Sequence, residues 1–314
     1  MNNILTAPSV GFEGFYLLEV IQQDGTLKQG KGLNVPFKNL LLNKFFLTIS
    51  PNGNGSDLSP SLEYCQVGTS STPPTVSDTA LGSRLAISPK SGVTYSYSYA
   101  SSAGTGYWRQ VACTFTFSVG AVVGNISEVG VANWENSALL SRSLIKDSEG
   151  NPTTITLTAT DQLKVKYSIR RTQPTTTTSG TLALVRDGVT ENHPWVWYPG
   201  GANESYPNLL PLYQNIVGGG ALYYTTDTPT ANANTYAVLN SQSGSHTSSS
   251  YNSTTKTVNT TYTFAIGTNF PSGFNIYRPL SGSSEEGYFY FPTPVTKTAT
   301  QKLVITSSYS MVAL

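Results

Sequence analysis

Leu163-Lys164-Val165-Lys166-Tyr167-Ser168-Ile169-Arg170 alternates apolar and polar side chains at every step. Successive side chains of a β-strand point to opposite faces of its sheet, so this period of two separates the apolar groups from the cations. The pattern is typical of an antiparallel sheet with one buried and one wet face. Thr114-Phe115-Thr116-Phe117-Ser118-Val119 and the series Tyr95, Tyr97 and Tyr99 alternate in the same way and predict further strands.

The composition of the 314 residues favours the same fold class. Only 11% are charged and 38% are hydrophobic, with 12 Phe and 19 Tyr, and Ser and Thr make up about a quarter of the chain. Thr, Tyr and Phe fit a pleated, half-buried surface, whereas exposed helix faces use Glu, Lys, Arg and Ala. Disordered chains are usually charged and poor in aromatic residues, unlike this one. We therefore predict an all-β protein of antiparallel β-sandwich units.

The chain also shows signs of an internal repeat. Thr114-Phe115-Thr116-Phe117-Ser118-Val119-Gly120 is echoed by Thr261-Tyr262-Thr263-Phe264-Ala265-Ile266-Gly267. Residues 161–168 have a looser echo in residues 300–307. Self-similarity of this kind indicates two related β-units.

The repeats and turn signals predict four parts. Residues 1–50 form an N-terminal hairpin and docking segment, in which Asp24-Gly25 supplies the turn. Residues 51–173 form the first β-sandwich unit, 174–256 a large loop-rich inserted lobe, and 257–314 a second, shorter β-unit that completes the sheet. The lobe is predicted from its Thr-rich start and its Ser-rich end.

Two segments are harder to assign. The apolar stretch from Pro36 to Leu47 fits either a short helix or a buried strand, because periodicity does not separate the two over so short a run. After the Pro-stiffened turn at Pro73-Pro74, we expect a helical start capped by Ser77 or Asp78.

Charge and cysteine content argue against several functions. The net charge of +1 gives no basic face for nucleic acid. Cys65 and Cys113 have no metal-type spacing with His, so we expect two buried small hydrophobes, no metal and no cofactor. No run approaches 18 apolar residues and Met1 to Phe12 lacks a signal-peptide pattern, so we expect no membrane span and assembly in a cytoplasm.

No motif brings catalytic residues together, and we expect no enzyme. The only histidines are His193, beside an aromatic run, and His246, in a Ser-rich stretch expected to be a loop. The adjacent Glu285-Glu286 would point to opposite faces of a strand, unlike the facing carboxylates of a polysaccharide hydrolase. Gly218-Gly219-Gly220 lacks the Lys-Ser/Thr that follows a phosphate-binding loop.

Trp195, Trp197 and Tyr198 form the best candidate contact site in the sequence. Flat aromatic faces stack on sugars and anchor protein interfaces, so the cluster fits a glycan contact or a subunit-interface contact. Burial in a core is the alternative, since aromatic side chains also dominate cores.

Several residue strings form a distinctive set in the first half of the chain. The set includes Cys65-Gln66-Val67-Gly68-Thr69, Pro73-Pro74 and Ser77-Asp78-Thr79-Ala80-Leu81, with the preceding Lys38-Asn39-Leu40-Leu41. These strings resemble uncharacterised structural proteins encoded in the tail regions of phages and prophages, and the resemblance extends further along the chain. It continues through Gly124-Asn125-Ile126-Ser127-Glu128-Val129-Gly130-Val131, Leu139-Leu140-Ser141-Arg142-Ser143-Leu144, Thr154-Ile155-Thr156-Leu157 and Asp161-Gln162-Leu163-Lys164-Val165. The matching region runs from Gly11 to Ile169 and leaves the lobe unmatched.

The resemblance implies a structural subunit of a tailed-phage virion, located in the tail, collar, baseplate or fibre assembly. Such a subunit is expected to form a trimer or higher cyclic oligomer and to bind other virion proteins, with the lobe projecting outward. A host-glycan-binding recognition module and a head fibre or capsid decoration protein are the alternatives. A polysaccharide depolymerase would release sugar from host envelope, and we expect no release.

Overall fold

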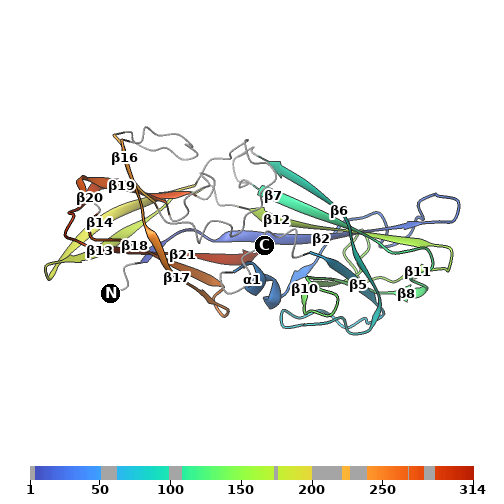
Figure 1. The fold of residues 1–314 in the computed structure, drawn as a ribbon. Coiled ribbons are helices and arrows are strands. Elements are labelled where there is room, and N and C mark those ends of the chain that lie inside the picture. The colour runs from blue at the N-terminus through green and yellow to red at the C-terminus, as the bar shows by residue number, and fades with distance from the viewer. Residues whose placement is uncertain are drawn as a thin grey trace.

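The computed structural model describes residues 4–50, 62–98, 108–172, 176–199, 221–226, 239–267, 269–278 and 287–314. Two β-rich units lie end to end in an elongated molecule, with the N-terminus at the second unit and the C-terminus near the middle (Figure 1). Apart from the helix α1 (Asn43–Ile49), the long regular elements of the described residues are strands, nearly all paired antiparallel. The predicted all-β fold is confirmed.

The first unit occupies the N-terminal part of the chain beyond residue 9. Its strands are β2 (Val10–Ile21), β3 (Phe37–Lys38), β4 (Leu40–Leu41), β5 (Tyr64–Gly68), β6 (Arg84–Ser98), β7 (Trp108–Thr116), β8 (Gly124–Ile126), β9 (Glu128–Ala132), β10 (Leu139–Leu144), β11 (Ile155–Leu157) and β12 (Gln162–Thr172). They hydrogen-bond in the order β2-β12-β7-β6-β5-β9-β10-β4, and β8 pairs with β11. The long strand β6 pairs with β7 along one half and with β5 along the other, which connects the two faces of the unit.

The core of the first unit follows the alternation seen in the sequence. Leu163, Val165, Tyr167 and Ile169 of β12 are all at most 1% exposed, as predicted. Cys65 and Cys113 are free thiols in the same core, which confirms that both act as buried small hydrophobes. Burial raises the pKa of the Cys65 thiol, so the group stays neutral and unreactive at ordinary pH.

The second unit contains the described strands from Thr178 onward and one strand from the beginning of the chain. It consists of β1 (Ile4–Thr6), β13 (Thr178–Arg186), β14 (Val189–Tyr198), β15 (Ala221–Tyr224), β16 (Asn240–Ser243), β17 (Ser245–Asn252), β18 (Thr257–Phe264), β19 (Phe270–Arg278), β20 (Tyr288–Lys297) and β21 (Leu303–Ala313). One sheet has the order β13-β14-β20-β19-β15-β16, and the other contains β17, β18, β21 and β1. Aromatic side chains such as Phe274, Tyr277 and Phe289 fill the core between them.

The strand pairing draws the unit boundaries differently from the sequence. The described residues between 176 and 256 do not form a separate lobe, because β14 pairs with β20, β15 with β19 and β17 with β18. Residues 1–50 are likewise divided, since β1 belongs to the second unit whereas β2 runs through the first. Strand pairing depends on contacts far apart in the sequence, which local composition does not encode.

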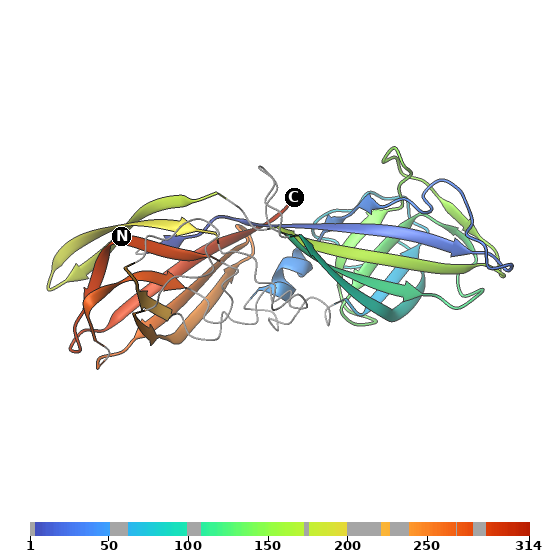
Figure 2. The same ribbon diagram turned by 90° about the horizontal axis from the view of Figure 1, so that it is seen from above.

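Strand β2 joins the two units without a flexible linker. From Gly11 to Ile21 it pairs antiparallel with β12, and from Val10 to Phe12 it pairs parallel with the end of β21. Figure 2 shows this long strand running from the middle of the molecule to the far end of the first unit. The two units therefore share one continuous sheet, and β12 and β21 run in opposite directions within it.

The predicted internal repeat is present as a repeated turn. Thr158-Ala159-Thr160 in the first unit recurs as Thr298-Ala299-Thr300 in the second. The first threonine of each turn donates its backbone N–H over 2.9 Å, to Asp161 Oδ2 in one unit and to Gln301 Oε1 in the other. The threonine hydroxyls of each turn hydrogen-bond to each other at 3.1 and 3.0 Å. Asp161 therefore corresponds to Gln301, one residue later than the sequence echo suggested.

A β-bulge recurs in the same way. One lies between Lys90 and Gly92 of β6, and the other lies between His246 and Ser248 of β17. The bulged residues are Ser91, whose hydroxyl lies 3.0 Å from that of Thr116, and Thr247, whose hydroxyl lies 2.7 Å from that of Thr263. Because equivalent strands carry equivalent bulges and turns, the units are two copies of one β-structure that point away from each other.

The two ambiguous segments also differ from expectation. The stretch from Pro36 to Leu47 contains both structures, the short strands β3 and β4 followed by α1. No helix begins at Ser77 or Asp78, where the chain makes a turn in which Thr75 N–H donates to Asp78 at 3.0 Å. At Asp24-Gly25 the predicted turn forms, with Gly25 at φ +81°, but the following residues make only one bridge, Ile21 to Leu27.

Candidate functional site

The tryptophans of the predicted contact cluster are core residues. Trp195 and Trp197 lie on the inward face of β14 and are 5% and 4% exposed. The Trp195 ring meets Phe289 edge to face at 5.2 Å between centroids. A sugar needs an accessible ring face for stacking, so these two residues do not form a glycan platform in this structure.

Tyr198 lies on the opposite face of the same strand. Its ring stacks on Tyr288 of β20 at 5.6 Å and meets Tyr290 at 6.3 Å, and the side chain is half-buried. The alternation along β14 thus splits the predicted cluster between the core and the outer face. Of the three residues, Tyr198 alone remains a candidate for an interface contact.

The other candidate catalytic residues are not brought together. His193 Nε2 lies 3.4 Å from Glu191 on the same strand, and His246 Nε2 lies 2.7 Å from the hydroxyl of Ser249. His246 belongs to strand β17 and not to the expected loop. Glu285-Glu286 and Gly218-Gly219-Gly220 lie outside the described residues.

Asp78, Glu128 and Arg142, which lie far apart in the sequence of the first unit, form a buried ion-pair network. Glu128 of β9 is fully buried and accepts hydrogen bonds from Arg142 of β10, from Nε at 3.0 Å and from Nη2 at 2.8 Å. Arg142 Nη1 donates to Asp78 at 2.5 Å. The backbone N–H groups of Gly82 and Ser83 also donate to Glu128, at 3.0 and 2.8 Å.

This network fixes the loop of residues 69–83 to the sheet. Burial opposes ionisation of Asp78, but hydrogen bonds from Thr75 and Arg142 outweigh it and hold the pKa of Asp78 below its usual range. Every charged group of the network already has partners within the protein. The network is therefore structural. The local sequence pattern did not predict it, because the pattern favoured Asp78 as a helix cap and did not single out Glu128 or Arg142.

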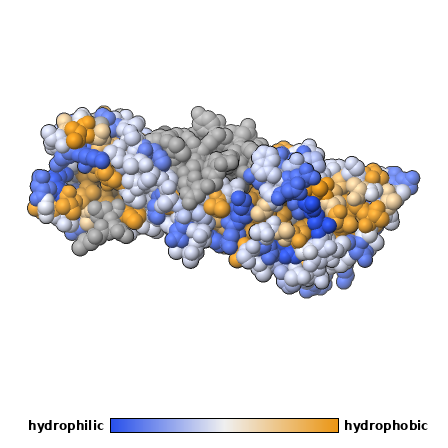
Figure 3. Space-filling view, turned by 60° about the horizontal axis from the view of Figure 1, so that its bottom comes forward, coloured by the Kyte–Doolittle hydropathy of each residue, from blue (hydrophilic) through white to orange (hydrophobic). Residues whose placement is uncertain are grey.

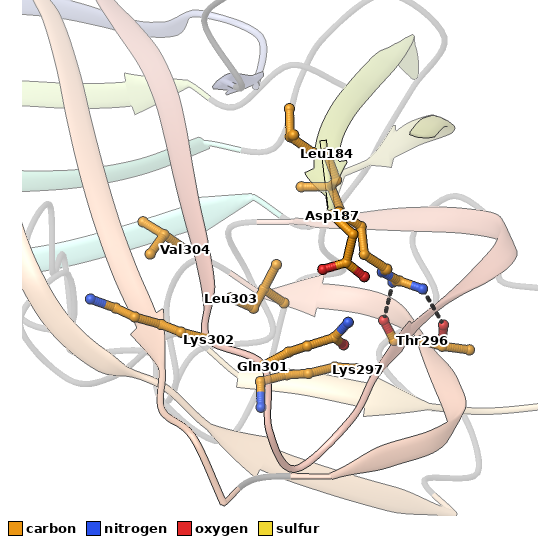
Figure 4. A pocket seen from close by; sticks show the side chains of 10 residues that line it. Leu184, Asp187, Thr296, Lys297, Gln301, Lys302, Leu303 and Val304 are labelled. Carbon is orange, nitrogen blue, oxygen red and sulfur yellow. Dashed lines mark hydrogen bonds between the residues drawn. The ribbon is translucent and has the colours of Figure 1, made fainter. Parts of the chain in front are cut away.

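An open pocket lies at the end of the second unit that is remote from the first. It has a volume of about 360 Å³ and lies between the β13–β14 hairpin and the β20–β21 turn. Figure 4 shows the Asp187 carboxylate pointing toward the Gln301 amide, with Leu303 to their left and Lys302 extending away. Arg186 donates to the carbonyl and hydroxyl oxygens of Thr296, at 2.8 and 3.3 Å.

Metal and membrane features are not evident in the residues that the structure describes. Among them, no three His, Cys, Asp or Glu side chains are grouped so that they could hold a metal ion. Their one helix is too short to cross a bilayer. On the face drawn in Figure 3, hydrophobic and hydrophilic residues are interspersed over both units.

No protein-family model, no curated protein and no solved structure matches the chain.

Proposed function

We propose that this chain is a non-enzymatic structural subunit of a tailed-phage virion, part of its tail, collar or fibre assembly. The observation that supports the proposal best is the continuous sheet through β2, which joins two copies of one β-unit into an elongated body. A shared sheet resists bending at the junction, because hydrogen bonds and packing would have to break together. A subunit with such a junction is suited to holding two parts of a particle at a fixed distance.

The residue network of the first unit supports the same proposal. The strings that resemble phage tail-region proteins hold the loop of residues 69–83 in place through Glu128 and Arg142. A rigid loop with satisfied charges suits a docking surface, on which a neighbouring subunit meets a fixed shape. Self-association as a trimer or higher cyclic oligomer, and contacts with other virion proteins, belong to this proposal.

Mass spectrometry of purified particles from the phage or prophage that encodes the chain tests the proposal. We expect the chain in the particles at a fixed ratio to the major capsid protein, with a host cytoplasmic enzyme as the negative control. Its presence in the lysate and absence from the particles would refute the assignment. Gold-labelled antibody then separates a tail or collar position from a head fibre or decoration protein.

The oligomeric state is tested separately by mass photometry of the purified chain. We expect a discrete trimer or higher cyclic species. A monomer that persists at particle-like concentrations would contradict the oligomeric part of the proposal. Incubation with host envelope should release no sugar, whereas release would identify a depolymerase.

A further inference from the structure

The pocket at the end of the second unit has a counterpart in the first unit, where the same place is closed. In the first unit Lys28 donates to the Thr156 carbonyl at 2.9 Å and to the Asp161 carboxylate at 3.2 Å. The Asp161 side chain is 5% exposed. This ion pair lies beside the Thr158-Ala159-Thr160 turn, because Asp161 also accepts the backbone N–H of Thr158.

The second unit has a counterpart of the hydrogen bond to the Thr156 carbonyl, but its described residues have no counterpart of the ion pair with Asp161. Arg186 donates to the carbonyl of Thr296, which occupies the position of Thr156 relative to the repeated turn. The residue in the place of Asp161 is Gln301, whose neutral amide offers no ion pair to Arg186 or to Lys302. No ion pair connects the tip of the β13–β14 hairpin to Gln301 of the β20–β21 turn. The pocket of about 360 Å³ lies between the hairpin and the turn.

Two polar groups of the pocket, those of Asp187 and Gln301, have hydrogen-bonding capacity left for a ligand. Among the described residues Asp187 makes no hydrogen bond or ion pair, although it is held in a left-handed conformation at φ +50° beside Gly188. Gln301 uses its Oε1 to accept the Thr298 N–H, so its NH2 group is the part left to donate. Lys297 points elsewhere, because its ammonium donates to the carbonyls of Ala265 and Thr298 at 2.9 and 3.3 Å.

We infer that this pocket binds a saccharide unit, with Asp187 and Gln301 as its polar contacts. A sugar ring carries neighbouring hydroxyls that each donate and accept, which fits a carboxylate acceptor facing an amide donor. Its C–H face fits the aliphatic side chains of Leu184 and Leu303, which line the same pocket. The volume lies at the low end of ligand pockets, about the size of one or two sugar rings.

Other ligand classes fit the pocket less well. A divalent cation prefers several oxygen ligands, whereas the pocket has one carboxylate beside Arg186, Lys297 and Lys302. A phosphate group would meet the Asp187 carboxylate, while the Arg186 guanidinium is already bonded to Thr296. A neutral, hydroxyl-rich ring avoids both conflicts.

Backbone amide shifts in NMR spectra of the full chain test the inference directly. The probes are the methyl glycosides of glucose, galactose and N-acetylglucosamine, each titrated into the millimolar range. We expect saturable shifts at Asp187, Gln301 and Leu303 with at least one probe, and none at the equivalent turn of the first unit. No saturable shift at these amides with any probe would overturn the inference, whether or not the chain is a virion protein.

Matched variants separate binding from folding. Asp187→Asn removes the charge and tolerates the left-handed conformation at this position. It should weaken the titration about tenfold or more, the usual effect of losing a hydrogen bond to a charged group. Gln301→Asp recreates the closed arrangement of the first unit, where an aspartate already accepts from the turn, and should abolish the shifts while the protein stays folded. Asp161→Gln in the first unit is the control and should leave them unchanged. Unaltered binding in both pocket variants would contradict the inference.

Discussion

Arg142 and Glu128 lie on the neighbouring strands β10 and β9, joined by two hydrogen bonds of 3.0 and 2.8 Å to the same carboxylate oxygen. Both side chains are almost completely buried, at 4% and 0% exposure. Burying a charged side chain costs free energy, and here each charge offsets that cost only while its partner is present. The pair therefore makes the loop of residues 69–83 depend on the sheet beneath it.

Replacing Arg142 should destabilise the protein strongly. Arg142→Met leaves Glu128 as a buried, unpaired carboxylate, and breaking a buried pair from one side costs about 3 to 5 kcal/mol. Urea denaturation measures the loss in the free energy of unfolding. Arg84→Met is the control, since Arg84 makes an exposed contact with the carbonyl of Glu135 at 3.3 Å. Equal stability of the two variants would show that the network contributes little.

Removing the buried tryptophans should affect stability and not surface recognition. Trp195→Ala and Trp197→Ala each delete a core ring, which typically costs about 3 to 5 kcal/mol. Tyr198→Ala, on the outer face, should cost clearly less. Thermal unfolding followed by circular dichroism compares the three variants. Wild-type stability in the Trp195 variant would contradict its place in the core.

Leu5 should stabilise a unit that begins more than 170 residues later in the chain. It is fully buried in the core of the second unit, where β1 pairs with β21. Leu5→Ala should cost about 2 to 5 kcal/mol, and the second unit should be the part that loosens. Fluorescence of Trp195 and Trp197, with Trp108 and Trp134 changed to Phe, reports on that unit. Leu27→Ala, at a side chain that is 47% exposed, is the control.

Asp161 should make stability depend on pH in the acid range. The backbone N–H of Thr158 and the ammonium of Lys28 lower its pKa, although burial opposes them. Because the folded-state pKa lies below the unfolded one, the stabilisation is complete above about pH 4, the ordinary pKa of aspartate, and is lost as the pH falls further. Unfolding by urea at several acid pH values measures this slope.

Asp161→Asn is the matched variant for the pH measurement. It should be less stable at neutral pH and should show a smaller decrease in stability on acidification. The second unit has Gln301 in this place. Because its amide does not titrate, this position adds no pH dependence to the free energy of unfolding. An identical pH dependence in wild type and variant would exclude Asp161 as a source of it.

The sequence predicted the features that depend on neighbouring residues. Alternation fixed the faces of β12, so Leu163 and Tyr167 were assigned correctly to the core. The similarity of residues 114–120 to 261–267 indicated the repeat, because each strand with its glycine turn is a local unit. The similarity of residues 161–168 to 300–307 is looser, and it predicts the position of Gln301 wrongly by one residue because few identical side chains set its alignment.

The sequence by itself determined that this chain is built of strands, which side chains face the core and that one β-structure occurs twice. Only the tertiary structure decided that β1 completes the second unit, that Trp195 is buried and that Gln301 leaves open the place that Lys28 and Asp161 close. Side-chain periodicity is a property of consecutive residues. Strand pairing and pocket shape depend on which distant segments come into contact, and the local pattern of a single sequence does not show those contacts.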